Sequence, residues 1–183
     1  GTFATSTVNA ASGTVQGLEA ALTWSPTPRV QFNIAYAFTD AGYDEWLLPQ
    51  PDGGTLDITG RPFTWIPEHS LSAMGRFDLL SSDVGDIDLV THIYWQDDVF
   101  ASDKDPFETE ILRDSQVESA YSVLDLRLNW GNVMGSNVDL SAYLKNASDK
   151  AYGVGGLNVL QDLGWVSRVY GAPRTYGVVA TYR

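Results

Sequence analysis

The chain has 183 residues, no cysteine and a formal net charge of −12, with hydrophobic side chains at 44% of its positions. This length suits one domain or a part of a larger one. The excess of acids excludes nucleic acid as a partner, because phosphates need cations to neutralise them. The absence of cysteine excludes disulfides and thiolate metal sites.

Apolar and polar residues alternate with a period of two along most of the chain, which predicts β-strands. In residues 121–130, for example, Leu124, Leu126 and Leu128 share one face and Asp125 and Arg127 share the other. No segment combines a helical stripe with caps, so the fold is predicted to be all-β. The expected strands, in chain order, are 1–8, 15–24, 30–39, 70–77, 87–96, 121–130, 138–146 and 175–183.

The connections between these strands alternate in length. Residues 25–29, 78–86 and 131–137 form short turns, whereas residues 40–69, 97–120 and 147–174 are long. An antiparallel up-and-down transmembrane β-barrel has short periplasmic turns and long extracellular loops. Strands of about nine or ten residues also match the roughly 9–11 that cross a bilayer at a tilt.

The second face of the strands is too polar for a dry core and suits a hydrated lumen, with the apolar face against lipid. Its polar members are Glu19, Gln31, Asn33, Arg76, Asp88, Asp125, Arg127, Asp139 and Lys145. Aromatic residues near strand ends would lie at the lipid–water interface: Trp24, Phe38, Trp95, Trp130 and Tyr182. A soluble meander packed on a second sheet would show the same alternation, but the loop asymmetry favours the membrane barrel.

Four stretches resemble TonB-dependent outer-membrane receptors. "YLKNASDKAYG" (143–153) is similar to the penultimate-strand motif of that family, with Ala147 where leucine is usual, and "YGAPRTYGVVATYR" (170–183) to its last strand. "GRPFTWIPEHSLSAMGRF" (60–77) and "VNAASGTVQGLEAALTWSP" (8–26) resemble two earlier segments in the right order.

The resemblance implies a plug domain and a barrel of about 22 strands, a size at which the lumen is plugged. Residues 1–183 are therefore interpreted as the C-terminal portion of such a barrel, about eight strands, with the plug and earlier strands absent. The polar run after Leu144 would begin an extracellular loop, and Tyr152 is expected in the aromatic belt. Family members generally end in an aromatic residue, so we expect about one residue to be missing after Arg183.

The resemblance also implies a function in the bacterial outer membrane. A receptor of this family imports a scarce nutrient, such as a ferric siderophore, cobalamin, haem or an oligosaccharide, with energy from the TonB protein acting on the plug. Its partners would be outer-membrane lipid, the TonB protein and the ligand, with no cofactor and no catalysis. Two alternatives stay open: a self-contained eight-stranded barrel, acting as a small outer-membrane or ligand-binding protein, and a secreted carbohydrate-active sandwich.

Aromatic residues in the long loops are the candidates for ligand binding: Trp46, Trp65, Phe100, Phe107, Trp165 and Tyr170. They would either stack on a ligand or pack the loops on one another. Paired acids such as Asp44 and Glu45 are expected to be solubilising charges, and the acidic loop 97–118 is either a hydrated loop or a cation site. The "GVGG" at 153–156 is expected to be a flexible loop.

Overall fold

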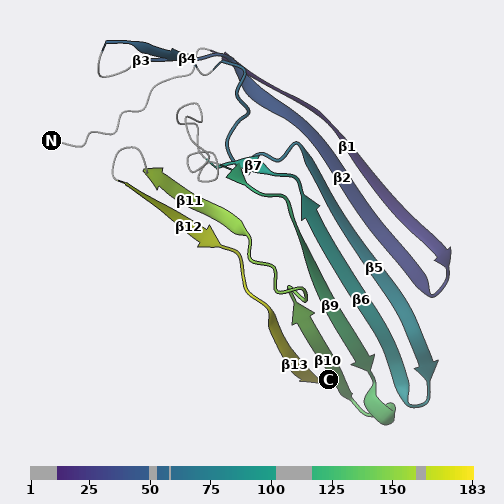
Figure 1. Cartoon of the computed structure of the whole chain (residues 1–183). Helices are drawn as coiled ribbons and strands as arrows, with labels where there is room; N and C mark the ends of the chain where they lie inside the picture. The colour runs from purple at the N-terminus through teal and green to yellow at the C-terminus, as the bar shows by residue number, and fades with distance from the viewer. Residues whose placement is uncertain (1–11, 50–52, 58, 102–116, 160–163) are drawn as a thin grey trace.

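Seven antiparallel strands form one curved sheet in the computed structural model, which describes residues 12–49, 53–57, 59–101, 117–159 and 164–183 (Figure 1). Each strand pairs with its neighbour along the chain, as in an up-and-down barrel wall. Their order is β1 (Ser12–Thr27), β2 (Val30–Glu45), β5 (His69–Ser82), β6 (Gly85–Gln96), β9 (Tyr121–Gly131), β10 (Val138–Lys145) and β13 (Thr175–Tyr182).

Short turns connect the strands at one end of the sheet, here called the turn end, and include a 3₁₀ turn, η1 (Val133–Gly135). The opposite loop end carries three two-stranded hairpins (Figure 1). They are β3 (Leu47–Pro49) with β4 (Thr55–Asp57), β7 (Val99–Phe100) with β8 (Val117–Glu118), and β11 (Gly153–Val159) with β12 (Trp165–Tyr170).

The seven main strands confirm the seven expected from residue 15 onward, whereas the strand expected at 1–8 lies outside the described residues. The hairpins were not predicted. The expectation that residues 153–156 form a flexible loop was wrong, because they belong to β11. Within the described residues β1 and β13 are the edges of an open sheet, so the chain does not form the closed eight-stranded barrel of the alternative.

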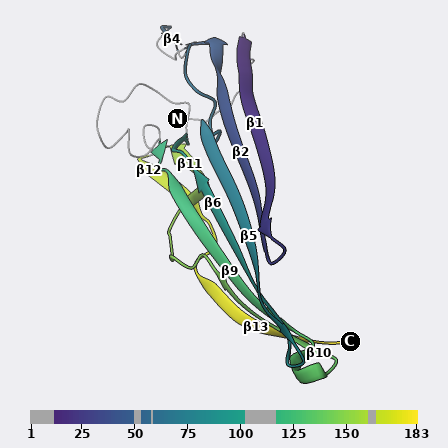
Figure 2. The same cartoon turned by 90° about the vertical axis from the view of Figure 1, so that its right-hand side faces the viewer.

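One face of the sheet, the apolar face, is continuous across all seven strands. Cross-strand pairing aligns Phe77 with Leu89, Leu89 with Leu128, and Ala142 with Val178. No second layer covers this face among the described strands (Figure 2), and Leu18 and Val178 are 60% and 74% exposed. The sandwich alternative is therefore wrong: a soluble sandwich buries such a face against a second sheet.

The opposite, polar face carries the expected charged and amide side chains in register. Asp88 pairs with Asn129 and Val90 with Arg127, and the side-chain amide of Asn129 donates to Asp88 Oδ2 at 2.8 Å. Arg76 contacts Asp78 at 3.1 Å and Asp88 at 3.6 Å. The polar side chains on this face thus form hydrogen bonds and ion pairs with one another across neighbouring strands.

β1 and β2 are longer than expected, with 16 residues each, and β5 has 14. Toward the loop end, the side chains of β1 and β2 on the apolar face are polar rather than apolar. Gln16 donates to Asp40 Oδ2 at 2.9 Å, and the Thr14 hydroxyl donates to Asp44 Oδ2 at 2.7 Å. Pairing of these two strands thus continues beyond the apolar band, because backbone hydrogen bonds need no apolar surroundings.

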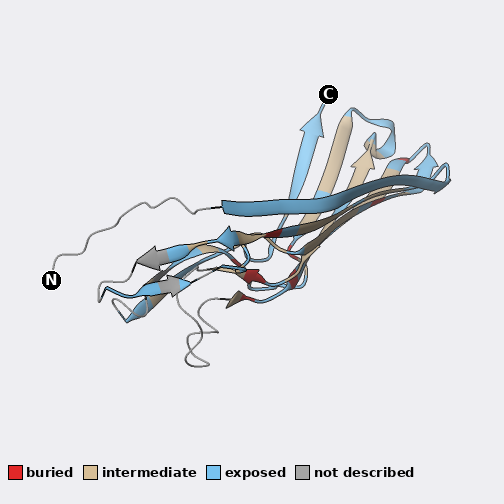
Figure 3. Cartoon of the chain, turned by 90° about the horizontal axis from the view of Figure 1, so that it is seen from above, coloured by how far each residue is buried: buried red, intermediate tan, exposed pale blue. Residues whose placement is uncertain are grey.

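Few residues are fully buried, and most of these lie at the loop end rather than beneath the sheet (Figure 3). Val99 is 2% exposed, Tyr121 8%, Glu118 9% and Asn146 2%. The compact part of the described structure is therefore the base of the long loops. No helix among the described residues is long and apolar enough to cross a membrane.

Candidate functional site

The turn after β10 is built around the buried side chain of Asn146. Its amide group donates to the carbonyl oxygens of Lys150 (2.9 Å) and Ala172 (3.1 Å), and its Oδ1 accepts the Lys150 N–H (2.9 Å). Its backbone N–H donates to Asp125 Oδ1 at 2.8 Å. With a φ of 47°, Asn146 adopts the left-handed conformation that asparagine tolerates better than most residues.

This turn explains why the sequence pattern of β10 stops at Lys145. Asn146 connects the end of β10 to β9 through Asp125 and to the start of β13 through Ala172. Asp149 adds a second connection, accepting the Arg174 N–H at 3.2 Å. The polar run is therefore a hydrogen-bonded junction of three strands, fixing where the third long loop leaves the wall and where it returns.

Tyr152 does not lie in the aromatic belt of the apolar face, and that expectation was wrong. Its ring stacks on Tyr121 with centroids 4.6 Å apart. Tyr121 belongs to the polar face, where it pairs with Gln96 and its hydroxyl donates to Gln96 Oε1 at 3.0 Å. A side chain at Gly171 would collide with the Tyr152 ring, so this glycine makes the placement possible.

The first long loop carries a cluster of three aromatic rings. The Tyr43 ring lies 4.2 Å from that of Trp46 and 4.6 Å from that of Phe63. The backbone N–H of Trp46 donates a hydrogen bond to the Thr59 hydroxyl oxygen (3.1 Å). In the same loop, hydrogen bonds from Thr59 lower the pKa of the Asp57 carboxyl. Trp46 therefore packs the loop on itself, one of the two roles expected for these aromatics.

Trp65 and Phe100 join the first long loop to the second. The backbone N–H of Trp65 donates a hydrogen bond to the carbonyl oxygen of Phe100 at 2.7 Å. This bond connects the segment before β5 to β7. Trp65 has a φ of 61°, a conformation that costs a bulky residue about 1 kcal/mol or more. The hydrogen bond between the loops holds that conformation in place.

Glu118 joins the second long loop to the third. Its side chain is 11% exposed, and its Oε1 accepts the Gly153 N–H at 3.0 Å while Oε2 lies 3.6 Å from Arg168 Nε. Gly153 begins β11 and Arg168 belongs to β12. Together with Trp65 and Phe100, Glu118 makes the bases of the three loops one connected unit, here called the loop junction.

Gly153→Ala should open the loop junction, because a Cβ at this position would meet the Glu118 carboxylate at 2.5 Å. We expect hydrogen exchange of the amides in β11 and β12 to become about tenfold faster, the equivalent of losing one hydrogen bond to a charged group. Gly155→Ala is the matched control, since nothing lies within 4 Å of its Cβ position. Equal exchange rates in both variants would contradict the role given to Glu118.

The remaining candidate aromatics differ in their surroundings. Trp165 and Tyr170 lie in β12, 45% and 60% exposed, and the described residues give neither ring an aromatic partner. Phe107 and most of the acidic loop 97–118 lie outside the described residues. Trp165 and Tyr170 are thus the described candidates with faces open to a ligand.

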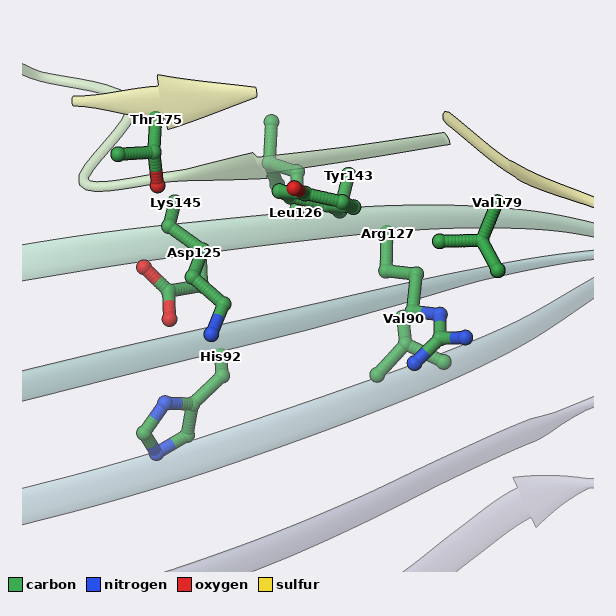
Figure 4. Close-up of a pocket in the computed structure, with 9 residues that line it drawn as sticks. All are labelled: Val90, His92, Asp125, Leu126, Arg127, Tyr143, Lys145, Thr175 and Val179. Atoms are coloured by element: carbon green, nitrogen blue, oxygen red, sulfur yellow. The ribbon is translucent and has the colours of Figure 1, made fainter. Parts of the chain in front are cut away.

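A hollow of about 430 Å³ lies on the polar face, between β6, β9, β10 and β13 (Figure 4). Side chains of Asp125, Arg127, Tyr143 and Lys145 extend into it, and its other lining residues are Val90, His92, Leu126, Thr175 and Val179. The pattern of alternation placed the charged residues on this face, but the hollow itself has no signal in the sequence because it depends on the curvature of the sheet.

The two histidines and Asp44 make hydrogen bonds within the sheet. His92 Nε2 lies 3.0 Å from the Ser72 hydroxyl on the polar face, and His69 Nδ1 lies 2.8 Å from the Tyr36 hydroxyl. Asp44 accepts a hydrogen bond from Thr14. Within the described ranges, no three histidine, aspartate or glutamate side chains are grouped so that they could hold a metal ion.

Solved structures with the same fold include siderophore receptors. The chain superposes on the ferric yersiniabactin uptake receptor from Yersinia pestis with a TM-score of 0.70 at 14% identity, covering 92% of this chain and 23% of that one. For the siderophore receptor PiuA from Acinetobacter baumannii the TM-score is 0.69 at 16% identity, with 92% and 21% covered. For the Pseudomonas aeruginosa ferripyoverdine receptor it is 0.62 at 16%, with 93% and 19% covered.

This chain therefore spans about a fifth of the length of these solved structures. A search of curated protein sequences gave no match. The family model described as "TonB dependent receptor-like, beta-barrel" matches residues 1–147, which is most of the chain. Together with the antiparallel sheet and its exposed apolar face, this match shows that the chain belongs to the family of TonB-dependent receptor β-barrels.

Proposed function

We propose that residues 1–183 are the C-terminal portion of the barrel of a bacterial outer-membrane receptor. That receptor imports a scarce nutrient, such as a ferric siderophore, with energy from the TonB protein. The observation that carries the proposal is the single curved sheet, which exposes a continuous apolar face on one side and a charged face on the other. Lipid outside and water inside are the surroundings that satisfy both faces.

The chain would contribute wall, loops and lumen to the receptor. The apolar face contacts lipid, the polar face lines the solute's path, and the three loops at the loop end meet the ligand outside the cell. Of the six aromatic loop candidates, Trp46, Trp65, Phe100, Phe107, Trp165 and Tyr170, we assign ligand contact first to Trp165 and Tyr170, which are exposed, and loop packing to Trp46. TonB would act on the plug, which lies N-terminal to this portion, so no residue of this chain is assigned a direct contact with TonB.

The import proposal is tested in cells that carry or lack the gene for the full-length protein. Under iron limitation, growth on one of a panel of ferric siderophores should require the gene and also a functional tonB gene. The protein should be recovered with the outer membrane. The proposal would be contradicted if growth on every ferric siderophore of the panel needed neither gene. Recovery of the protein in the soluble fraction would also contradict it.

Two loop substitutions separate ligand contact from loop packing. Trp165→Ala should weaken ligand binding by about fivefold, since stacking on an aromatic ring is worth about 1 kcal/mol, without changing thermal stability. Trp46→Ala should instead lower the melting temperature, because its ring packs on Tyr43. Affinity and melting curves are measured on both full-length variants; unchanged affinity in Trp165→Ala would remove Trp165 from the ligand site.

A further inference from the structure

We propose that Glu118 is a latch for the β11–β12 hairpin, here called the arm, and holds it where Trp165 and Tyr170 meet a ligand. The proposal rests on the proposed function, in which these two exposed aromatics contact the solute. It goes beyond that function by assigning Glu118 as a positioning residue and by giving the arm a second, released position. The contacts that carry the proposal all lie within this chain.

The two strands of the arm form a sheet of their own. β11 pairs with β12 from Gly153 to Val159, and among the described strands neither pairs with a strand of the seven-stranded wall. Figure 1 shows the arm beyond the ends of β10 and β13, at the loop end. A hairpin of two strands is only marginally stable in water by itself. Side-chain contacts and the two connections to the wall therefore set the position of the arm.

The two connections are fixed at the wall and short above it. The side chain of Asn146 bonds to Lys150 on one connection and to Ala172 on the other. Between this turn and the arm stand only residues 151–152 on the first connection and Gly171 on the second. A hinge of this length lets the arm tilt as one body but does not let it swing freely. Wall and arm are thus two bodies joined at a defined place.

Glu118 holds both strands of the arm from the second long loop. Its Oε1 accepts the Gly153 N–H of β11 at 3.0 Å, and its Oε2 lies 3.6 Å from Arg168 Nε of β12. The hydrogen bond to a carboxylate is charge-assisted and therefore stronger than one between neutral groups. Replacement of this one carboxylate would remove the hydrogen bond and the ion pair together, so a single side chain controls the position of the arm.

The latch is suited to release, whereas the Asn146 turn is not. The Arg168 side chain is already 38% exposed, and both ionic groups regain water when the arm tilts away. Separating them therefore costs much less than their direct attraction. The Tyr152 ring, stacked on Tyr121 with centroids 4.6 Å apart, lies in the hinge and stays in place as the pivot. We expect the latch to open while the turn below it remains formed.

The latched position sets where the candidate ligand residues lie. Tyr170 pairs with Gly153, the residue whose N–H Glu118 accepts, and Arg168 is two positions away on the same strand. Trp165 belongs to that strand as well. A ligand that contacts both the arm and the rest of the receptor requires one position of the arm, so its apparent affinity falls in proportion to the latched fraction. Glu118 thus acts on ligand binding without touching the ligand.

The test measures the position of the arm in the full-length receptor in detergent micelles by pulsed EPR. This chain has no cysteine, so nitroxide labels are attached at Val169→Cys on the arm and at Asp83→Cys at the turn end, both exposed positions. Any cysteine elsewhere in the receptor is replaced by serine. We expect one narrow distance distribution in the parent protein. Glu118→Ala should raise the ratio of released to latched protein about tenfold, without changing the melting temperature of the barrel.

Two further variants separate the charge of Glu118 from its hydrogen bond. Glu118→Gln keeps an acceptor for the Gly153 N–H but loses the charge opposite Arg168, so its released fraction should lie between those of the parent and Glu118→Ala. Asp98→Asn is the matched control, since it removes one negative charge from an exposed position of the same loop. Its distance distribution should equal that of the parent.

Three results would overturn the proposal. The first is an equal distance distribution in Glu118→Ala and the parent. The second is a broad distribution in the parent, because the arm would then have no latched position. The third is a lower melting temperature of the barrel in Glu118→Ala, which would make Glu118 a stabilising residue of the wall instead of a latch.

These results are independent of the import proposal. The EPR measurement needs neither TonB nor the imported nutrient, whereas the growth test needs both. A parent protein without a latched distance but with TonB-dependent growth would remove the latch alone. A latched arm in a protein that supports no such growth would remove the import function alone.

Discussion

Replacing Leu128 with arginine should lower the free energy of unfolding of the membrane-inserted protein by about 2 kcal/mol, the cost of a cation on the lipid face between the bilayer midplane and the interface. Leu128 is 44% exposed on the apolar face and pairs with Leu89 on β6 and Ala142 on β10. Neither Leu89 nor Ala142, the side chains paired with Leu128, offers a guanidinium a hydrogen-bond acceptor. The measurement is urea-dependent refolding of the full-length protein into phospholipid vesicles.

Val123→Arg is the matched control on the same strand. Val123 pairs with Tyr94 on the polar face, so an arginine there extends toward water and the free energy of unfolding should change by less than about 1 kcal/mol. The prediction depends on the difference between the two variants rather than on either value. If Val123→Arg were as destabilising as Leu128→Arg, the polar face would not be hydrated and the assignment of lumen and lipid would be wrong.

Replacing Asn146 with alanine should lower the free energy of unfolding by about 3 kcal/mol. Two carbonyl oxygens and one N–H lose their partner in a site where Asn146 is 2% exposed, at about 1 kcal/mol each. Alanine also tolerates the left-handed conformation less well than asparagine, since its short side chain makes no local hydrogen bond. The same refolding assay measures the loss.

Two further variants separate the hydrogen bonds from the shape of the side chain. Asn146→Asp keeps the acceptor for the Lys150 N–H but places oxygens against the carbonyls of Lys150 and Ala172, so it should be at least as destabilising as alanine. Ser148→Ala, an exposed position in the same turn, should change stability by less than about 0.5 kcal/mol. A stable Asn146→Asp protein would show that the two donated bonds contribute little.

The aromatic residues chosen from the sequence as ligand-binding candidates differ in their surroundings in the structure: some contact other loop residues and others are exposed. Aromatic residues in long loops are recognisable without coordinates, but their neighbours are not. The Trp46 ring packs on Tyr43, and the backbone of Trp65 is hydrogen-bonded to that of Phe100. Trp165 and Tyr170, in contrast, are exposed. The difference depends on contacts between residues up to dozens of positions apart, for which a single sequence carries no local signal.

The loop hairpins were missed for a related reason. β11 contains three glycines, a composition that resembles a flexible loop, yet its strand pairing with β12 runs from Gly153 to Val159. Gly153 is required for close approach to Glu118 rather than for flexibility. Short strands of this kind form because a partner segment and a loop base are already in place, so their propensity alone does not reveal them.

The sequence by itself determined the strands of the wall, their two faces and the end at which the long loops lie. Alternation with a period of two is a local property, and it fixes which side chains share a face wherever the strand is placed. Only the tertiary structure decided the loop junction at Glu118, the Asn146 turn, the placement of Tyr152 on the polar face and the hollow beside Arg127. Each of these depends on the register and curvature that bring separate strands together, and distances between strands are not encoded in the pattern of any one of them.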